Sequence, residues 1–140
     1  LAYRTPGVLF CGDTLFGAGC GRLFEGTPAQ MADALAAIAA LPPETAIYCA
    51  HEYTAMNLPF ALAVEPENAL LRARATRVAA ARAAGEPTVP LLLADELATN
   101  PFLRCHVPEV IAAGVQAGAV SSAPVDVFAA LRAWRNVFQA

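Results

Sequence analysis

Two short, continuously apolar runs with a helix signal between them constrain this fold more than any other feature of the sequence. Residues 7–11 (Gly-Val-Leu-Phe-Cys) and 46–50 (Ala-Ile-Tyr-Cys-Ala) have the composition of strands that are covered on both faces. Between them, Thr27 and Gln30 can form the two halves of a capping box at a helix start, and Pro42 ends that helix. The order strand, helix, strand predicts a βαβ unit, in which the two strands run parallel.

A strong metal ligand follows each of these runs: Asp13 after the first and His51 after the second. Ligand-binding residues favour the C-terminal ends of parallel strands, so both side chains are expected at one edge of the sheet. Taken singly, such an Asp is most often a turn former and such a His a packed interior group. Together, a carboxylate that can bridge two cations and an imidazole that can hold one of them predict part of a two-metal hydrolase site.

The sequence changes character near residue 55. Residues 13–26 form a glycine-rich loop, and no strand is expected beyond residue 54. Helices are expected instead over residues 57–64, 68–84, 92–97, 107–117 and 124–138. Pro59 is expected to break the first of these helices, and the arginines of the second are expected away from its buried face. We therefore predict an α/β part over residues 1–54 and an all-α domain over residues 55–140.

Composition excludes several classes of protein. The net charge is −3 and all nine basic residues are arginines, which leaves no basic footprint for a nucleic acid. The longest uncharged stretch, residues 110–125, is too short and too broken by Gly and Pro to span a bilayer. Without a signal-peptide pattern, the prediction is a cytoplasmic protein with no membrane partner. Its dispersed cysteines are expected as reduced, buried thiols: Cys11, Cys20, Cys49 and Cys105.

Three stretches around the candidate ligands carry a family resemblance. They are Leu-Phe-Cys-Gly-Asp-Thr-Leu-Phe (9–16), Gly-Cys-Gly-Arg-Leu-Phe-Glu-Gly-Thr (19–27) and Ile-Tyr-Cys-Ala-His-Glu-Tyr-Thr (47–54). Further stretches follow at residues 64–68, 85–90, 100–104 and 131–135. Over nearly the whole chain, the sequence resembles the C-terminal part of the hydroxyacylglutathione hydrolases (glyoxalase II), a family with the metallo-β-lactamase fold.

This resemblance implies a fold and an activity. The fold is α/β, a partial metallo-β-lactamase αββα sandwich, followed by an all-α C-terminal domain that binds glutathione. The activity is hydrolysis of a glutathione thioester, S-D-lactoylglutathione, to glutathione and D-lactate, a step of methylglyoxal detoxification. The family uses two divalent metals, zinc with iron and manganese as alternatives, to activate water and polarise the thioester carbonyl.

The resemblance also assigns roles to individual residues. Asp13 matches the carboxylate that bridges the metals, and His51 matches a histidine on the second metal. Substrate contacts fall to Arg22, Tyr53, Arg132 and Arg135. Guanidinium groups suit the carboxylates of glutathione, and Arg132 and Arg135 are three residues apart, so they share a helix face.

Some positions depart from the family pattern. Arg135, Ala50, Phe24 and Cys11 stand where Lys, Gly, Tyr and Thr are common. More importantly, the family's T-H-x-H-x-D-H motif and a further upstream histidine are not in this sequence, and His106 matches no ligand position. We therefore expect little hydrolysis by this chain alone and a missing N-terminal half as a partner.

Two alternatives remain open at this point. The chain can be a non-catalytic module that binds glutathione, or one half of a split enzyme. A different enzyme of the same fold, such as a persulfide dioxygenase, is disfavoured by the helical tail that carries Arg132 and Arg135.

Overall fold

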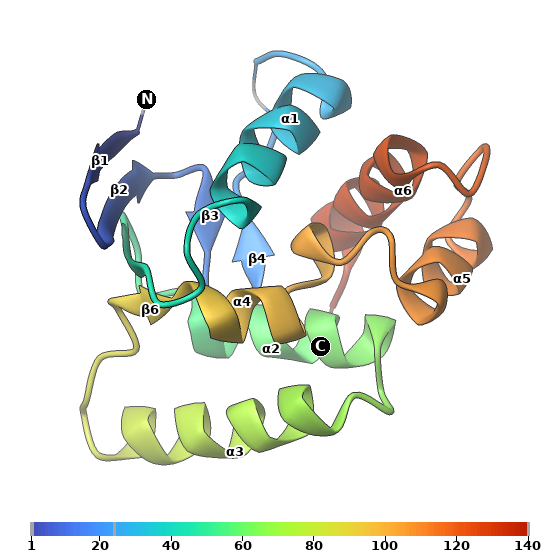
Figure 1. The fold of residues 1–140 in the computed structure, drawn as a ribbon. Helices are drawn as coiled ribbons and strands as arrows, with labels where there is room; N and C mark the ends of the chain where they lie inside the picture. Colours follow the sequence, from blue (N-terminus) through green and yellow to red (C-terminus); the bar gives the residue numbers. More distant parts are fainter. Residues whose placement is uncertain (1, 24, 140) are drawn as a thin grey trace.

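A computed structural model describes residues 2–23 and 25–139, so the substitution at Phe24 lies outside the described residues (Figure 1). The strands are β1 (Tyr3–Thr5), β2 (Val8–Gly12), β3 (Leu15–Phe16), β4 (Gly19–Cys20), β5 (Ala46–Cys49) and β6 (Leu91–Leu92). The helices are α1 (Pro28–Ala39), α2 (Thr54–Val64), α3 (Ala69–Ala83), α4 (Leu93–Thr99), the 3-10 helix η1 (Pro101–Leu103), α5 (Pro108–Gln116) and α6 (Pro124–Val137). The protein is thus of mixed α/β content, with a small sheet and several helices.

The predicted βαβ unit is confirmed. In the main sheet, with the order β1-β2-β5-β6, the central strands β2 and β5 run parallel and α1 connects them. Thr27 caps α1 through a complete capping box with Gln30, because each residue accepts a hydrogen bond from the other's backbone N–H. Both predicted parallel strands therefore end at the same edge of the sheet.

The expectation that no strand follows residue 54 is wrong. Leu91 and Leu92 form β6, which pairs antiparallel with β5 through Ile47 and Ala46. Two residues are too few to show a strand period in sequence, and their pairing depends on a partner more than forty positions away. The glycine-rich loop after β2 likewise contains a short hairpin, β3–β4, that was not predicted.

Two helix predictions also need correction. α2 begins at Thr54 and continues through Pro59, because the proline removes one backbone hydrogen bond while apolar packing holds the rest of the helix. In α3, Arg74 lies on the buried face between Leu71 and Val78, since a buried carboxylate from α4 pairs with it. The C-terminal stop of α3 is as expected, with Gly85 at a φ of 74°.

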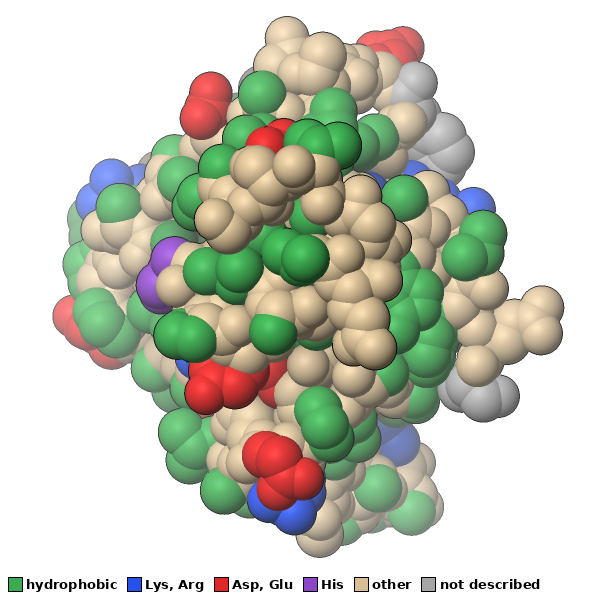
Figure 2. All heavy atoms as spheres, turned by 90° about the vertical axis from the view of Figure 1, so that its right-hand side faces the viewer, with side chains coloured by type: hydrophobic (Ala, Val, Ile, Leu, Met, Phe, Trp, Pro, Cys, Tyr) green, Lys and Arg blue, Asp and Glu red, His purple; other side chains and the backbone are tan. Residues whose placement is uncertain are grey.

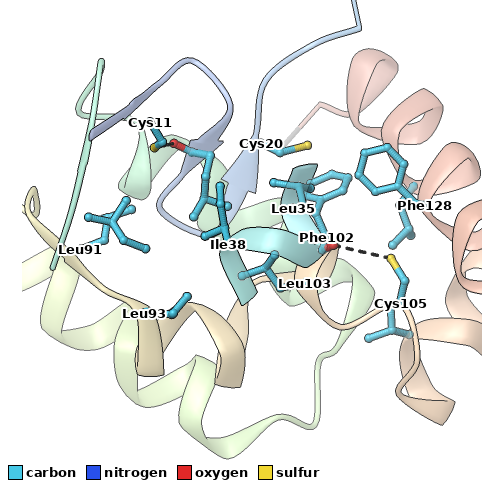
Figure 3. Packing of buried hydrophobic residues seen from close by; sticks show 14 of the residues in the cluster. Cys11, Cys20, Leu35, Ile38, Leu91, Leu93, Phe102, Leu103, Cys105 and Phe128 are labelled. Atoms are coloured by element: carbon cyan, nitrogen blue, oxygen red, sulfur yellow. Dashed lines mark hydrogen bonds between the residues drawn. The ribbon is translucent and has the colours of Figure 1, made fainter. Parts of the chain in front are cut away.

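The main hydrophobic core joins the sheet to the helices (Figure 3). Leu9, Ile47 and Leu91 of the sheet lie in one buried cluster with Leu35 of α1 and Phe128 of α6. The aromatic rings of Phe60, Phe102, Phe128, Trp134 and Phe138 contact one another at the helical end of this cluster. Core residues therefore come from both sides of residue 54.

The two faces of the main sheet differ sharply. Leu9 and Ile47 point into the core, whereas their neighbours Phe10 and Tyr48 point outward and are 45% and 41% exposed. Phe10 and Tyr48 are register partners whose rings stack at a centroid distance of 5.2 Å, and exposed Tyr3 lies opposite Phe10 on β1. No described helix has the length and apolar character that a membrane crossing requires.

Candidate functional site

Asp13 and His51 lie next to each other where β2 and β5 end. Gly12 closes β2 with a φ of 55°, and its carbonyl accepts a hydrogen bond of 2.9 Å from the backbone N–H of Ala50. This bond ties the two post-strand segments together, and it places His51 Nε2 3.3 Å from Asp13 Oδ1. The side chains are 49% and 73% exposed, so both offer donor atoms to a ligand from solvent.

Aromatic contacts hold the imidazole of His51 from one side. Its ring stacks on that of Tyr53 at 4.7 Å with an interplanar angle of 15°. Phe16, from strand β3, lies 4.9 Å from the Tyr53 ring and 5.9 Å from His51. The β3–β4 hairpin therefore sets the position of two residues that the sequence assigned to the site.

Glu52, between His51 and Tyr53, anchors the segment that precedes β6. Its carboxylate accepts hydrogen bonds from the backbone N–H and hydroxyl of Thr88 and from the N–H of Val89. Burial alone would raise the pKa of Glu52, but the hydrogen bonds from Thr88 and Val89 outweigh it and hold that pKa below its usual value. Glu52 is therefore a fixed, ionised anchor rather than a free base.

Asp13 and His51 fit part of a metal site. A carboxylate and an imidazole at this separation are ordinary ligands for zinc and similar ions. Across the described residues, no group of three or more His, Cys, Asp and Glu side chains is placed to hold a metal. The described part of the chain thus brings together two ligands, fewer than the three or four that a zinc site uses.

The three arginines of the predicted substrate site also gather. Arg22 lies exposed in the loop after β4, while Arg132 and Arg135 come from α6. The pKa of Arg135 is lowered, first by its burial and then by the positive charges of Arg132 and Arg22. Positive charges that act on one another in this way favour an anionic ligand.

Arg132 is not a free surface group. It is 5% exposed, and its Nη1 donates to the backbone carbonyls of Cys20 at 2.8 Å and Gly21 at 3.2 Å. Its Nη2 donates to Asn136, and its guanidinium lies 5.3 Å from the Phe102 ring. Among the described residues, its Nε has no hydrogen-bond partner. Arg132 therefore stabilises the end of the β3–β4 hairpin by binding its backbone carbonyls.

Backbone contacts of Gly21 connect Arg132 with the loop that carries Asp13. The carbonyl of Gly21 binds Arg132, and its N–H donates to Thr14 at 3.2 Å. A side chain at Gly21 would come within 2.1 Å of the backbone oxygen of Asp13. The loop of Asp13 and the hairpin end held by Arg132 are thus in direct backbone contact, which only glycine allows.

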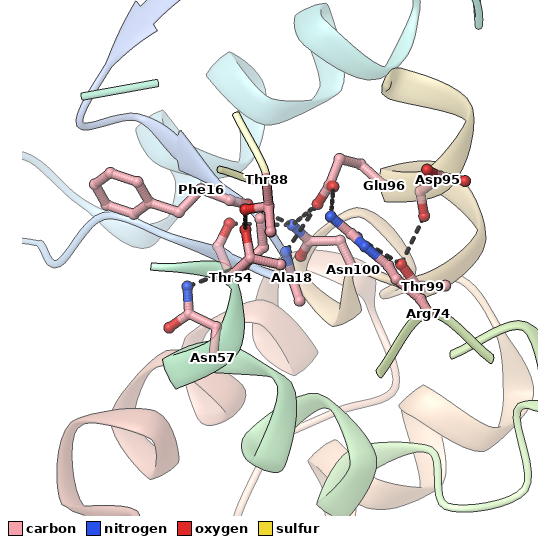
Figure 4. Close-up of polar contacts among 12 residues, drawn as sticks. Phe16, Ala18, Thr54, Asn57, Arg74, Thr88, Asp95, Glu96, Thr99 and Asn100 are labelled. Carbon is pink, nitrogen blue, oxygen red and sulfur yellow. Dashed lines mark hydrogen bonds and ion pairs between the residues drawn. The ribbon is translucent and has the colours of Figure 1, made fainter. Parts of the chain in front are cut away.

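Three polar side chains that the sequence did not single out clamp the β3–β4 turn (Figure 4). Asn57 donates to Gly17 O at 3.1 Å, and Asn100 donates to Phe16 O at 3.2 Å and Gly19 O at 3.0 Å. Glu96 accepts from the N–H of Ala18, which has a φ of 55°, and pairs with Arg74. Asn57 and Glu96 are polar residues within helices, and Asn100 lies between α4 and η1, which is too common a pattern to predict a partner.

A sizeable groove among the described residues lies elsewhere. It has a volume of about 1170 Å³ and is bordered by α2, α5 and α6, with apolar Trp134 and Val137 and acidic Glu67 and Glu109 among its lining residues. Figure 2 looks onto the α5 and α6 side of the molecule, where hydrophobic and acidic side chains both reach the surface. Neither Asp13 nor His51 lines this groove, so it is separate from the candidate metal ligands.

A family model and the similar proteins found for this chain agree on one protein family. Residues 52–138 match the family described as Hydroxyacylglutathione hydrolase C-terminus. Proteins named hydroxyacylglutathione hydrolase from Dechloromonas aromatica and Methylobacillus flagellatus are 61% and 56% identical, each over 99% of this chain and over 57% and 54% of their own lengths. The one from Xanthomonas campestris pv. campestris is 54% identical over the whole chain and 55% of its own length.

This chain therefore spans about half the length of the curated relatives it matches. The matched family region begins at Glu52, directly after His51, whereas the alignments with the relatives extend over the sheet and the Asp13 loop as well. The residues that form the candidate site thus all lie within the region of shared sequence, and the chain belongs to the hydroxyacylglutathione hydrolase family, whose C-terminal part it matches.

Proposed function

We propose that this chain is the C-terminal, substrate-binding part of a thioester hydrolase. The reaction converts an S-(2-hydroxyacyl)glutathione, such as S-D-lactoylglutathione, and water into glutathione and a 2-hydroxy acid. The observation that carries the proposal is the 3.3 Å approach of His51 Nε2 to Asp13 Oδ1 beside the stacked Tyr53 ring. Asp13 and His51 are 38 positions apart in the sequence, and Arg132 lies 81 positions beyond His51, so their gathering is a property of the fold.

We propose Asp13 and His51 as metal ligands. Two divalent metal ions, zinc or alternatively iron or manganese, would lower the pKa of a bound water and polarise the thioester carbonyl. Asp13 offers two oxygens, which suits a bridge between cations, and His51 offers one nitrogen, whose ring is steadied by Tyr53. We place the remaining ligands outside the described residues, which supply no third ligand next to this pair.

We propose that the glutathione moiety lies between Tyr53 and the arginines. Arg22 is exposed and Arg135 is half-buried, so both guanidinium groups can reach a carboxylate from the ligand side. Arg132 contributes its positive charge without contacting the ligand directly, because its own hydrogen bonds go mainly to the hairpin carbonyls. Tyr53 supplies a ring and a hydroxyl on the side nearer to the metal ligands.

We further propose that the sheet is half of a metallo-β-lactamase αββα sandwich, with residues 1–54 as its remnant and residues 55–140 as the glutathione-binding domain. The exposed apolar face with Phe10 and Tyr48 supports this, because an apolar sheet face is normally covered by a second layer. The division follows the order of the sequence: core packing crosses residue 54, and β6 adds a strand from the second part to the sheet.

The test is activity with and without the sequence that the longer relatives add. We expect the 140-residue chain alone to bind glutathione and to turn over no S-D-lactoylglutathione. Joined behind the N-terminal part of the Dechloromonas aromatica relative, it should hydrolyse the thioester, and Asp13→Ala or His51→Ala should abolish this activity.

A second candidate is a non-catalytic glutathione-binding module, which the absence of a third ligand among the described residues favours. That alternative gains support if the joined protein binds glutathione without turnover. Turnover by the 140-residue chain alone, with two metals bound per chain, would contradict the proposal that other ligands are needed.

A further inference from the structure

We infer that Asn57 is a positioning residue that couples the substrate-binding Arg135 to the β3–β4 turn beside the candidate metal ligands. The inference rests on the proposed function for the role of Arg135 as an anion-binding group. Asn57 itself was assigned no role by sequence, and it touches neither candidate metal ligand.

The contacts of Asn57 define two opposite ends of one carboxamide. Its Nδ2 donates to Gly17 O at 3.1 Å, and its Oδ1 accepts from Arg135 Nη2 at 3.3 Å. The side chain is buried, with 8% exposure, so water does not replace either contact easily. Asn57 lies in the first turn of α2, where its N–H bonds to the carbonyl of Tyr53.

Only one orientation of this amide satisfies both partners. Rotating it by half a turn would set the NH₂ group against a guanidinium that only donates, and the oxygen against a carbonyl that only accepts. An Asp at this position could bind Arg135 but would repel the Gly17 carbonyl, and an Ala would bind neither. The position is therefore specific for an amide of this length.

Close packing keeps the amide in place. A side chain at Gly19 would come within 2.5 Å of Asn57 Nδ2, so the turn backbone lies directly on the carboxamide. Gly17 follows Phe16, whose ring contacts Tyr53 and His51. A displacement of Arg135 by a bound carboxylate is thereby passed through Asn57 to the strand that carries Phe16.

The charge of the arginine cluster explains why a neutral partner suits this position. Arg135 lies near Arg132 and Arg22, and a neutral oxygen orients its guanidinium without cancelling its charge. A carboxylate there would compete with the ligand for the same guanidinium. The structure thus assigns Asn57 the task of aiming Arg135 while leaving it available to an anion.

The experiment uses the isotopically labelled 140-residue chain with glutathione as the probe. In Asn57→Ala, we expect the dissociation constant for glutathione to rise about fivefold, the effect of one lost hydrogen bond. In Asn57→Asp, which keeps the shape of the side chain, we expect a larger rise and a weaker salt dependence, because an internal ion pair replaces the free charge.

Two signals report the coupling without any ligand: the Arg135 Nε–H resonance and the backbone amide of Ala18, whose peptide group includes Gly17 O. Both should move in Asn57→Ala, and the Ala18 signal should also move in Asn57→Asp. Asn68→Ala is the matched control, because it removes the α3 cap and lowers stability without touching Arg135. It should leave both signals and the glutathione affinity unchanged.

The two proposals fail in different ways. If the wild-type chain and Arg135→Ala bind glutathione equally well, or neither binds it, the substrate site of the proposed function is wrong. If the Arg135 and Ala18 signals stay in place in both Asn57 variants, or if Asn57→Asp binds glutathione as tightly as the wild type, the positioning role of Asn57 is wrong.

Discussion

At the scale of single residues, the ion pair of Arg74 and Glu96 lies inside the protein. Their side chains are 5% and 0% exposed, and Glu96 also accepts hydrogen bonds from Ala18 and Asn100. Removing only the carboxylate of such a pair lowers the free energy of unfolding strongly, because the partner's charge then stays buried without a counter-charge or water. Its value here is geometric, since it fixes the turn of the β3–β4 hairpin.

Glu96→Ala is expected to lower the free energy of unfolding by about 3–5 kcal/mol, because it leaves Arg74 buried without a partner. Urea denaturation measures the change. Glu67→Ala is the matched control, since Glu67 is 90% exposed and only 3.7 Å from Arg72, and it should leave stability nearly unchanged. Equal effects of the two substitutions would contradict a structural role for the buried pair.

The buried cysteines are expected to make the free energy of unfolding depend on pH. Burial is the main cause that raises the pKa of Cys105 to about 12 and those of Cys20 and Cys49 to about 11, against an ordinary value of 9.0. Unfolded thiols ionise from about pH 9 while folded ones stay neutral, so this stability is fully present below pH 9 and is lost as the pH rises toward 12.

Cys105→Ala therefore should show a smaller fall in unfolding free energy between pH 8 and pH 10 than the wild type. The expected difference is about 1 kcal/mol, the linkage contribution of one thiol one unit above its unfolded pKa. Urea midpoints at the two pH values decide this. Parallel pH profiles for the two proteins would show that Cys105 ionises alike in both states.

At the scale of elements, the β3–β4 hairpin depends on close backbone approach. A side chain at Gly17 would lie 2.0 Å from Thr54 Oγ1 and 2.8 Å from Thr54 Cβ, at the first residue of α2. The hairpin is thus seated on α2, which leads directly from the His51 segment.

Gly17→Ala is expected to lower the unfolding free energy by about 2 kcal/mol, as overpacking does, and to shift the NMR signals of Phe16 and His51. Gly7→Ala is the control, because the added methyl group meets no atom of the described residues within 4 Å and carries only the strain of a φ of 76°. It should leave those ring signals in place. Unchanged His51 signals in Gly17→Ala would argue that the hairpin does not position the site.

Elements with a local signal were predictable from sequence, and those held by distant partners were not. The capping box at Thr27, the glycine at the end of α3 and the parallel strands all follow from short-range patterns. β6 is a two-residue strand whose partner is more than forty positions away, and the two-residue strands β3 and β4 receive hydrogen bonds from distant side chains.

The candidate site divides in the same way. The approach of Asp13 to His51 follows from the parallel strands that precede them, so it was predictable. The burial of Arg132 and the contact of Asn57 with the hairpin were not, because their partners there are backbone carbonyls. A backbone carbonyl carries no residue-specific signal in a sequence.

At the scale of the whole molecule, the exposed apolar face of the sheet governs behaviour in solution. Tyr3, Phe10, Tyr48 and Leu92 are 41–65% exposed and lie on adjacent strands. The 140-residue chain is therefore expected to self-associate as its concentration rises, and Phe10→Thr with Tyr48→Thr should reduce this without lowering stability. Sedimentation velocity measures the degree of self-association. Equal self-association of the wild type and the double variant would show that another surface causes it.

The position of β6 in the chain limits how this protein can be recombined with its relatives. Because β6 and the Glu96 clamp follow α3 in sequence but belong with the strands in space, the helical region is not a cassette that can be exchanged at residue 54. If residues 55–140 were joined to the α/β part of another protein, the edge strand β6 would come from one parent and the rest of the sheet from the other. The side chains that bind the β3–β4 hairpin would likewise come from a different parent than the hairpin itself. Successful chimeras should therefore inherit residues 15–20 and 54–100 from one parent.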